Sequence, residues 1–172
     1  MQNLILIGFM GAGKTSVGKY LAHKTGMTFV DTDERIVAEQ GMEIAAIFEK
    51  YGEPYFRDLE TDLLERMQTD TENSVISVGG GMPVRERNRE LLRSLGCVVW
   101  LLASKATILG RVSGDGTRPM LSGGDLEARV ERLMREREAL YRDAAHLMIQ
   151  TDGLNIAEAA DTVLREARKF RY

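Results

Sequence analysis

The segment Gly8-Phe-Met-Gly-Ala-Gly-Lys-Thr15 constrains the fold of this 172-residue chain more than any other, because of what lies on either side of it. The apolar run at residues 4–7 is typical of a short buried strand, and residues 16–24 place Val17 and Leu21 on one face of a helix. The glycines therefore fall in a turn from strand to helix, where successive backbone N–H groups can converge on a phosphate. A purely structural glycine-rich turn is the alternative, but the strand–turn–helix setting favours a site for a nucleoside triphosphate.

The same segment fits the P-loop pattern G-x-x-x-x-G-K-S/T, which assigns chemistry to two of its side chains. Lys14 is expected to reach the β- and γ-phosphates of the nucleotide. The hydroxyl of Thr15 is expected to hold Mg²⁺. The pattern thus predicts a nucleotide and a metal ion, but it leaves the reaction open.

Composition and charge restrict the class of protein. The chain has the length of one domain, residues 1–172, and its 44% hydrophobic and 28% charged content is that of an ordinary globular protein. A net charge of −3 gives no reason to expect a nucleic acid or an anionic membrane as a partner, so an anionic substrate must be held by a few local arginines. No apolar stretch approaches the ~20 residues that cross a bilayer, and no basic region of a signal peptide precedes the first apolar run. Since the single Cys97 lies in an apolar run, where a buried thiol is expected, we predict a cytoplasmic protein.

Short apolar runs alternate with helical patterns along the chain. The strands are expected at residues 4–7, 28–31, 75–78, 98–102 and 147–151. The helices are expected at residues 16–24, 34–40, 43–50, 54–67, 83–94, 106–112, 126–144 and 156–169. This order predicts an α/β fold with a five-stranded parallel sheet and helices on both faces, in which ligands bind at the carboxyl ends of the strands.

One glycine-rich segment, residues 113–124, interrupts the alternation with four glycines and one proline. It is either a disordered surface connection or a mobile lid that closes over the nucleotide and brings Arg118 to the phosphates. We favour the lid, because Arg118 lies before Pro119 in a hinge-like loop. Arg111 ends the helix predicted before this segment and is either a solvated surface residue or a second arginine associated with the lid.

Two acids, Asp31 and Asp33, follow the second predicted strand. On an extended segment, side chains two residues apart point the same way. One carboxylate is then expected to face the Mg²⁺ through its water shell, and the other to take the proton of an acceptor hydroxyl. In the alternative interpretation, Asp33 or Thr32 caps the helix that starts at Glu34. The P-loop favours the functional interpretation.

Three consecutive glycines, Gly79, Gly80 and Gly81, follow the third predicted strand and are called the glycine run below. One glycine is enough for a turn, whereas three allow a ligand to approach the backbone closely, with amide N–H groups exposed as donors. A flexible turn before the next helix is the alternative.

Two arginines are candidates for holding an anion. Arg137 falls on the apolar stripe of its predicted helix, where a guanidinium needs an anionic partner. That partner is either a structural glutamate or, as we prefer, a bound carboxylate or phosphate. Arg57 lies one turn from Glu60, and the two form either an exposed salt bridge or a pair in which Glu60 orients Arg57 toward an anion.

Several separated motifs occur in one order along the chain. They are the P-loop, Phe29-Val-Asp-Thr-Asp33, Gly52-Glu-Pro-Tyr-Phe-Arg57-Asp-Leu-Glu60, the glycine run, Thr117-Arg-Pro-Met-Leu121 and Arg137-Glu-Ala-Leu-Tyr141. Together they resemble the shikimate kinase family, and the resemblance runs nearly from end to end. It implies a three-layer P-loop fold of the nucleoside-monophosphate-kinase type, with a lid near 113–124 and substrate-binding helices near 34–67.

The resemblance also implies roles on the nucleotide side. The phosphates would be held by Gly11, Ala12, Gly13, Lys14, Thr15 and Ser16. Thr15 would ligate Mg²⁺ with Asp31 in the outer shell, and Arg118, with Lys14, would stabilise charge on the transferring phosphoryl group. Arg111 and residues 151–155 resemble the positions that flank the adenine.

On the acceptor side, the resemblance implies that Asp33 orients the acceptor hydroxyl and deprotonates it. The substrate would be fixed by Arg57, Gly79, Gly80, Gly81 and Arg137, with the arginines on its carboxylate. Glu60 would position Arg57.

The implied reaction is transfer of the γ-phosphoryl group of ATP to the 3-hydroxyl of shikimate, with Mg²⁺ as cofactor and a monomeric enzyme. Two alternatives stay open from the sequence. One is a related small-molecule kinase, such as a gluconate kinase, and the other is a catalytically silent nucleotide-binding module. The base at Asp33, together with the two arginines and the glycine run, argues against the first, and the presence of Lys14, Asp33 and Arg118 argues against the second.

Overall fold

The structure of the chain is a computed structural model that describes residues 2–112 and 125–170. The predicted lid at 113–124, with Arg118, lies outside the described residues. The expectations for that segment therefore stay predictions.

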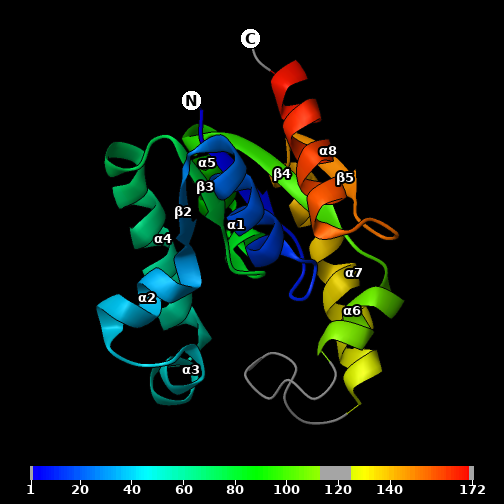
Figure 1. Cartoon of the computed structure of the whole chain (residues 1–172). Coiled ribbons are helices and arrows are strands. Elements are labelled where there is room, and N and C mark those ends of the chain that lie inside the picture. Colours follow the sequence, from blue (N-terminus) through cyan, green and yellow to red (C-terminus); the bar gives the residue numbers. More distant parts are fainter. Residues whose placement is uncertain (1, 113–124, 171–172) are drawn as a thin grey trace.

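The described residues form one five-stranded sheet in which all neighbouring strands are parallel, in the order β2-β3-β1-β4-β5. The strands are β1 (Leu4–Ile7), β2 (Thr28–Asp31), β3 (Ser74–Ser77), β4 (Cys97–Leu102) and β5 (Leu147–Gln150). After β2 at one edge of the sheet, the chain returns through β3 and crosses over β1 to reach β4. This places β1 in the centre, so the P-loop after β1 lies at the middle of the sheet's carboxyl edge (Figure 1). This is the place where open α/β sheets bind ligands.

The apolar content of each strand matches its place in the sheet. The three central strands β1, β3 and β4 are buried almost throughout, whereas the edge strands β2 and β5 are partly exposed. A central parallel strand has helices on both faces and therefore reads as a continuous apolar run, such as Leu-Ile-Leu-Ile in β1. The strands predicted from such runs are all present, with bounds shifted by no more than one residue.

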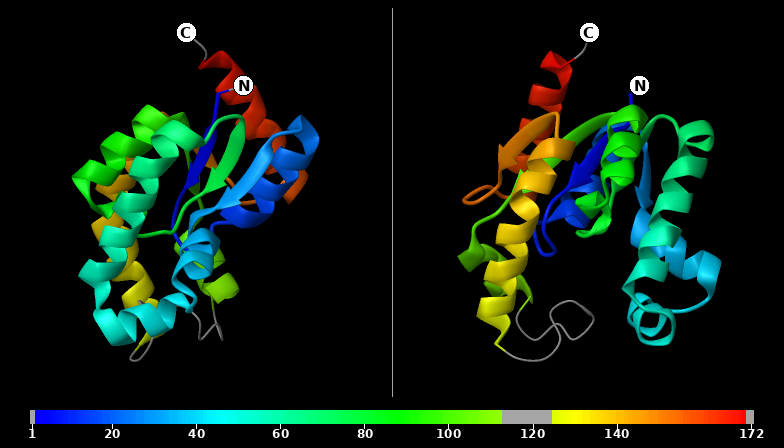
Figure 2. Two further views of the ribbon diagram at one scale, coloured as in Figure 1. Left: turned by 90° about the vertical axis from the view of Figure 1, so that its left-hand side faces the viewer. Right: turned by 180° about the vertical axis from the view of Figure 1, so that it is seen from behind.

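Helices cover both faces of the sheet. They are α1 (Lys14–Thr25), α2 (Thr32–Gln40), α3 (Ile44–Tyr51), α4 (Glu53–Asp70), α5 (Glu86–Leu95), α6 (Lys105–Val112), α7 (Leu126–Ala144) and α8 (Ile156–Lys169), with a short 3₁₀ turn η1 (Met82–Val84). Figures 1 and 2 show α1 and α8 on one face and α4, α5 and α7 on the other. Helices α2, α3 and α6 extend beyond the carboxyl ends of the strands (Figure 1).

The prediction of a single helix at 83–94 was wrong. The segment divides into η1 and α5, because Arg85 between them has an extended backbone with φ −80° and ψ 133°. The amide of Val84 donates to the carbonyl of Gly81 at 3.1 Å, so η1 closes directly onto the glycine run. Through this bond, η1 ties Gly81, the last residue of the glycine run, to the segment that leads into α5.

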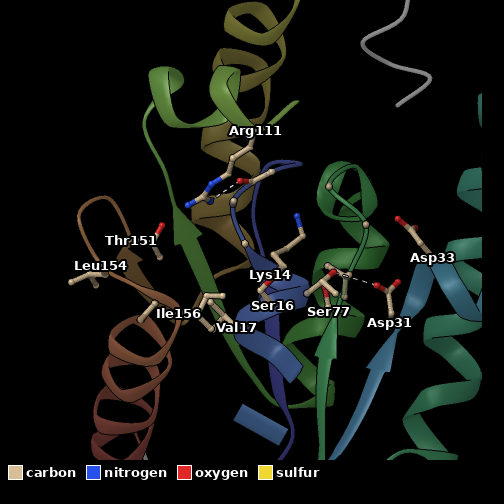
Figure 3. Close-up of a pocket in the computed structure, with 18 of the residues that line it drawn as sticks. Lys14, Ser16, Val17, Asp31, Asp33, Ser77, Arg111, Thr151, Leu154 and Ile156 are labelled. Carbon is tan, nitrogen blue, oxygen red and sulfur yellow. Dashed lines mark hydrogen bonds between the residues drawn. The ribbon is translucent and has the colours of Figure 1, made fainter. Parts of the chain in front are cut away.

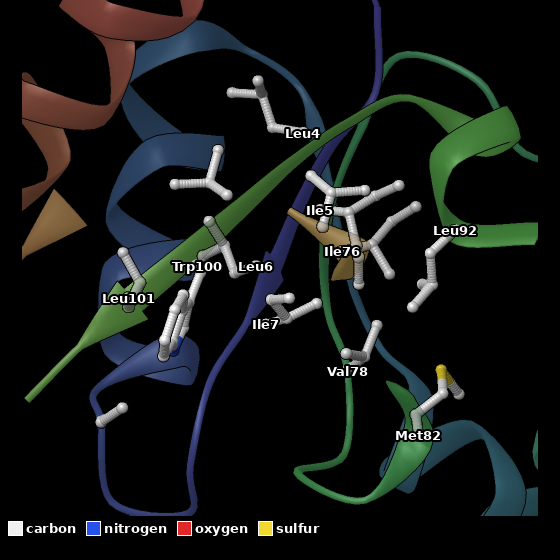
Figure 4. Close-up of a cluster of buried hydrophobic side chains, with 14 of the residues drawn as sticks. Leu4, Ile5, Leu6, Ile7, Ile76, Val78, Met82, Leu92, Trp100 and Leu101 are labelled. Atoms are coloured by element: carbon white, nitrogen blue, oxygen red, sulfur yellow. The ribbon is translucent and has the colours of Figure 1, made fainter. Parts of the chain in front are cut away.

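The core lies between the sheet and its helices. Successive residues of a strand face opposite sides, and Figure 4 shows Ile5, Ile7 and Ile76 on the side where Leu92 of α5 lies. Cys97 is buried at 1% exposure, which confirms the predicted buried thiol. Among the described residues, no helix has the length and apolar character needed to cross a membrane.

Candidate active site

The P-loop leaves β1 after Ile7 and enters α1 at Lys14. Its turn depends on positive φ angles at Gly11 (+82°) and Gly13 (+96°), a region that L-residues with a side chain rarely adopt. Gly13 is the N-cap of α1, and no side chain of the described residues caps the helix there. The first amides of α1 therefore point toward the cavity in front of the loop, the arrangement that attracts an anion.

Lys14 lies across its own loop. Its Nζ donates to the carbonyls of Gly8 at 2.7 Å and Phe9 at 3.1 Å, and the residue is only 9% exposed. An ammonium group has three donors, so these bonds hold the charge at the mouth of the loop, where phosphates would lie.

A cavity of ≈ 390 Å³, the P-loop cavity, opens in front of these residues. Figure 3 shows Lys14 between Arg111 and Thr151 on one side and Asp31, Asp33 and Ser77 on the other. Every residue from Gly11 to Ser16 lines it, as do Leu154 and Asn155 of the segment expected beside the adenine. Arg111 also donates from Nη1 to the carbonyl of Gly11 at 2.8 Å. The structure thus brings the described P-loop residues, Asp31, Arg111 and three of the residues 151–155 to one cavity.

Thr15 and Asp31 meet at the wall of this cavity. The hydroxyl of Thr15 lies 3.5 Å from Oδ2 of Asp31, while Oδ1 of Asp31 accepts from the amide of Glu34 at 3.1 Å. Asp31 is therefore the N-cap of α2, which excludes the alternative in which Asp33 or Thr32 caps this helix. Asp33 lies in the first helical turn and not on an extended segment, because α2 begins two residues earlier than predicted.

A larger cavity of ≈ 840 Å³ lies beside the first, and we call it the α2–α4 cavity. Its walls come from α2, α3, the start of α4, the glycine run, Met10 and Arg137. Asp33, Gly79 and Gly80 line both cavities. The carboxylate of Asp33 is therefore at the junction where a group could pass from one cavity to the other.

Arg57 and Glu60 form a buried ion pair on α4. Nη1 of Arg57 donates to Oε1 of Glu60 at 2.6 Å, and the two residues are 7% and 0% exposed, which excludes the exposed salt bridge left open by the sequence. Glu53 accepts from the other side of the guanidinium at 3.3 Å. Burial lowers the pKa of Arg57, but the two carboxylates outweigh burial and raise it above its usual value. Burial likewise raises the pKa of Glu60 to about 7, against the opposing effect of Arg57.

Arg137 is 4% exposed on the inner face of α7. Its guanidinium carbon lies 5.8 Å from the centre of the Phe9 ring. Within the described part of the chain, its buried Nη1 has no hydrogen-bond partner. A buried donor of this kind is costly to leave unpaired, so its position on the α2–α4 cavity favours a bound anion over a structural glutamate.

The glycine run makes room for charged side chains. A Cβ atom on Gly81 would lie 2.2 Å from Nη2 of Arg57, and one on Gly79 would lie 2.7 Å from Oδ1 of Asp33. The sequence had suggested room for a ligand and exposed amides, but the amide of Gly79 already donates to the hydroxyl of Thr32 at 3.2 Å. Glycine is needed at Gly79 and Gly81 because a side chain there would clash with Asp33 or Arg57.

Three further polar residues support the site and were not identified from the sequence. The hydroxyl of Tyr141 donates to the carbonyl of Gly80 at 2.6 Å, and burial keeps the proton on this phenol by raising its pKa. Asn88 is fully buried and joins Thr61 of α4 (2.7 Å) to the carbonyl of Met82 (2.9 Å). Ser77, at the carboxyl end of β3, lines the P-loop cavity. Of these three residues, only Ser77 could have been identified from the sequence, because its hydroxyl ends a buried strand.

Comparison with known proteins identifies the family. The family model described as shikimate kinase matches residues 10–168. The chain belongs to the shikimate kinase family. A shikimate kinase of Thermodesulfovibrio yellowstonii is 42% identical over 99% of this chain and 97% of its own length. One of Caldicellulosiruptor bescii is 41% identical over 95% of this chain and 94% of its own length.

The solved structures agree in fold. The shikimate kinase from Acinetobacter baumannii in complex with shikimate is 36% identical and superposes with a TM-score of 0.95, covering 99% of this chain and 95% of that chain. A gluconokinase from Sinorhizobium meliloti has a TM-score of 0.61 at 17% identity, covering 98% of this chain and 95% of that chain, a likeness of fold alone. The P-loop kinase fold predicted from the sequence is therefore confirmed.

Proposed function

We propose that this protein is an ATP-dependent kinase that transfers the γ-phosphoryl group of ATP to the 3-hydroxyl of shikimate, giving shikimate 3-phosphate and ADP. The reaction belongs to the biosynthesis of chorismate and the aromatic amino acids. Membership of the shikimate kinase family supports this activity. The observation that carries the proposal is the place of Asp33, which lines both the P-loop cavity and the α2–α4 cavity.

The P-loop cavity would take the triphosphate. The uncapped amides at the start of α1 and the ammonium of Lys14 would lie against the phosphates. Lys14 would exchange its bonds to the carbonyls of Gly8 and Phe9 for bonds to phosphate oxygens. Arg111 and residues 151–155 would flank the adenine, since Arg111, Thr151, Leu154 and Asn155 line the cavity.

The oxygen atoms beside the P-loop suit Mg²⁺. Thr15 and Asp31 offer a hydroxyl and a carboxylate at one point of the wall. Among the described residues, no group of three or more histidines, cysteines or acids could hold a metal ion by itself. Mg²⁺ is usually bound through one or two protein oxygens, water and substrate phosphates, so Thr15 would be a direct ligand and Asp31 an outer one. When bound, the ion would neutralise charge on the phosphates.

The α2–α4 cavity would take shikimate, a small hydroxylated carboxylate. Arg57 and Arg137 line it with two buried guanidinium groups, which suit a carboxylate. Glu60 holds Arg57 through the 2.6 Å bond and would keep its remaining donors aimed at the substrate. The glycine run forms the floor between the two arginines and Asp33.

The chemistry would then take place at the junction of the cavities. Asp33 would accept the proton of the 3-hydroxyl as that oxygen bonds to the γ-phosphorus, and the bond from phosphorus to the β–γ bridging oxygen would break. Lys14 would stabilise the charge on the transferring group. Arg118 is assigned the same task by the family motif, and it lies outside the described residues.

We further propose that the enzyme acts as a single-domain monomer in the cytoplasm, without nucleic acid or membrane partners. The net charge of −3 supports the lack of a polyanionic partner. Gel filtration at several protein concentrations tests the monomer, and a mass that rises to that of a dimer would contradict it.

Turnover of ATP by the purified protein tests the proposed function. Separate reactions would contain shikimate, gluconate, a nucleoside monophosphate or no acceptor. We expect shikimate alone to support release of ADP well above the background without acceptor. Equal ADP release with and without shikimate would contradict the proposal, and turnover with gluconate would favour the other small-molecule kinase.

A further inference from the structure

We propose that Glu60 takes up a proton when the carboxylate of the acceptor docks on Arg57 and Arg137, so that substrate binding is coupled to protonation of a buried carboxyl group. The proton comes from the buffer and goes to Oε2 of Glu60. This inference rests on the proposed function, because it needs an anionic acceptor in the α2–α4 cavity.

Glu60 is only half satisfied by its surroundings. It is 0% exposed, and its Oε1 accepts the short bond from Arg57. Its Oε2 is buried and has no hydrogen-bond partner within residues 2–112 and 125–170. An ionised carboxylate is an acceptor only, so this oxygen carries charge without a donor to stabilise it. A proton placed there removes that cost.

A second acid lies close to this oxygen. A Cβ atom on Gly79 would be 3.2 Å from Oε2 of Glu60 and 2.7 Å from Oδ1 of Asp33. Because both distances start from the same point, Oε2 of Glu60 and Oδ1 of Asp33 can be no farther apart than the sum of the two distances. At such a separation each negative charge disfavours the other.

The remaining charged groups come from the surrounding helices. Glu60 interacts with Arg57 of its own helix α4, with Asp33 of α2 and with Arg137 of α7. Glu53 of α4 shares the guanidinium of Arg57. Among the described residues, Glu34, Glu43 and the phenol of Tyr141 are also nearby: the two glutamates line the same cavity, and Tyr141 interacts with both arginines.

The free site balances two guanidinium groups against the carboxylates of Asp33 and Glu60, with the half-exposed Glu53 at its edge. The pKa of Glu60 is already about 7, because burial outweighs the attraction of Arg57 and the charge of Asp33 adds to burial. A substrate carboxylate brings a further negative charge into the site and competes for the donors of Arg57. Both effects raise the pKa of Glu60 further, so the bound complex holds a proton that part of the free enzyme lacks.

Isothermal titration of shikimate into the protein tests this directly. The slope of the observed binding enthalpy against the ionisation enthalpy of several buffers gives the number of protons taken up. With a free pKa of about 7, about half of Glu60 is ionised at pH 7 and about nine-tenths at pH 8, which are the upper limits of the uptake. We expect a positive slope at both pH values.

Two variants locate the proton. Glu60→Gln keeps an oxygen that accepts from Arg57 but does not titrate, so the slope should fall to zero. Glu53→Gln is the matched control, because Glu53 also bonds to Arg57 but has a side chain that is 43% exposed. This control should keep the slope of the wild type.

The outcomes separate the two proposals. Saturable binding of shikimate with a slope of zero at both pH values would overturn the proton uptake and leave the proposed function intact. An unchanged slope in Glu60→Gln would overturn the assignment to Glu60. The absence of any binding of shikimate would overturn the proposed function and, with it, this inference. Should Glu60→Gln fail to fold, the wild type decides, since a slope of zero at both pH values contradicts the proposal.

Discussion

Replacement of Gly81 by alanine should disable the acceptor side of the site, although the backbone permits alanine there. Gly81 has φ −92° and ψ −5°, an ordinary right-handed conformation, so the change introduces no backbone strain. The new Cβ would lie 2.2 Å from Nη2 of Arg57 and 2.5 Å from its Cζ. The expected damage is therefore confined to the position of this guanidinium.

The magnitude follows from the contact. Non-bonded heavy atoms pack at about 3.5 Å or more, so the guanidinium must retreat by about 1 Å, enough to break its 2.6 Å bond to Glu60. A hydrogen bond to a charged group is worth about 1.5–3 kcal/mol, and its loss leaves Glu60 buried without a donor. We expect the free energy of unfolding to fall by about that amount. The KM for shikimate should rise roughly 10- to 100-fold, since a displaced Arg57 binds the carboxylate poorly.

Steady-state kinetics with each substrate varied in turn, together with urea unfolding, measure both effects. The control is Gly80→Ala, whose Cβ would meet its nearest neighbours, Nη1 of Arg137 and the backbone nitrogen of Met10, at 3.4 Å. This substitution should change the KM for shikimate much less. A Gly81→Ala enzyme with the stability and KM of the wild type would refute the idea that the glycine exists to admit Arg57.

Three further changes test other parts of the site. Asp33→Asn should lower kcat by roughly 10²- to 10⁴-fold with little change in the KM for either substrate, and an unchanged kcat would remove Asp33 as the base. Arg137→Met should raise the KM for shikimate roughly 10- to 100-fold and leave the Kd for ADP unaltered, whereas equal weakening of both would contradict its place on the acceptor side. Between pH 4.5 and 7 the native Glu60 holds a proton that the unfolded chain has lost, so stability should fall as pH rises through this window. Relative to the Glu60→Gln variant, the free energy of unfolding of the wild type should fall by about 3 kcal/mol across this window, as measured by urea unfolding. Parallel pH profiles of the two proteins would show that Glu60 titrates normally.

The fold could be predicted closely because its signals are local. The bounds of β1, β2, α7 and α8 agree with those expected, since continuous apolar runs and helix caps specify them. The side chain of Asn155 forms a capping box with Glu158, a pattern visible within four residues of sequence. The failures lie where one residue decides between conformations. Arg85 divides a segment that periodicity joins into one helix, and Asp31 caps α2 in place of Thr32 or Asp33.

The site could be predicted where a residue is unusual in its own local sequence. Arg137 is a charge on an apolar stripe, and the glycine run places three consecutive glycines after a buried strand. Tyr141 gave no such signal, because its hydroxyl acts on Gly80, which is 61 residues away in sequence. Asn88 likewise acts through contacts with η1 and α4 that only the folded chain creates.

The central claim is that the α2–α4 cavity holds the acceptor with its carboxylate on two buried arginines. A crystal structure of the protein with shikimate and ADP tests it most directly. We predict shikimate in this cavity, with carboxylate oxygens about 3 Å from guanidinium nitrogens of both Arg57 and Arg137 and a ring hydroxyl at the same distance from Asp33. Shikimate bound elsewhere, or with its carboxylate turned away from both arginines, would contradict the account.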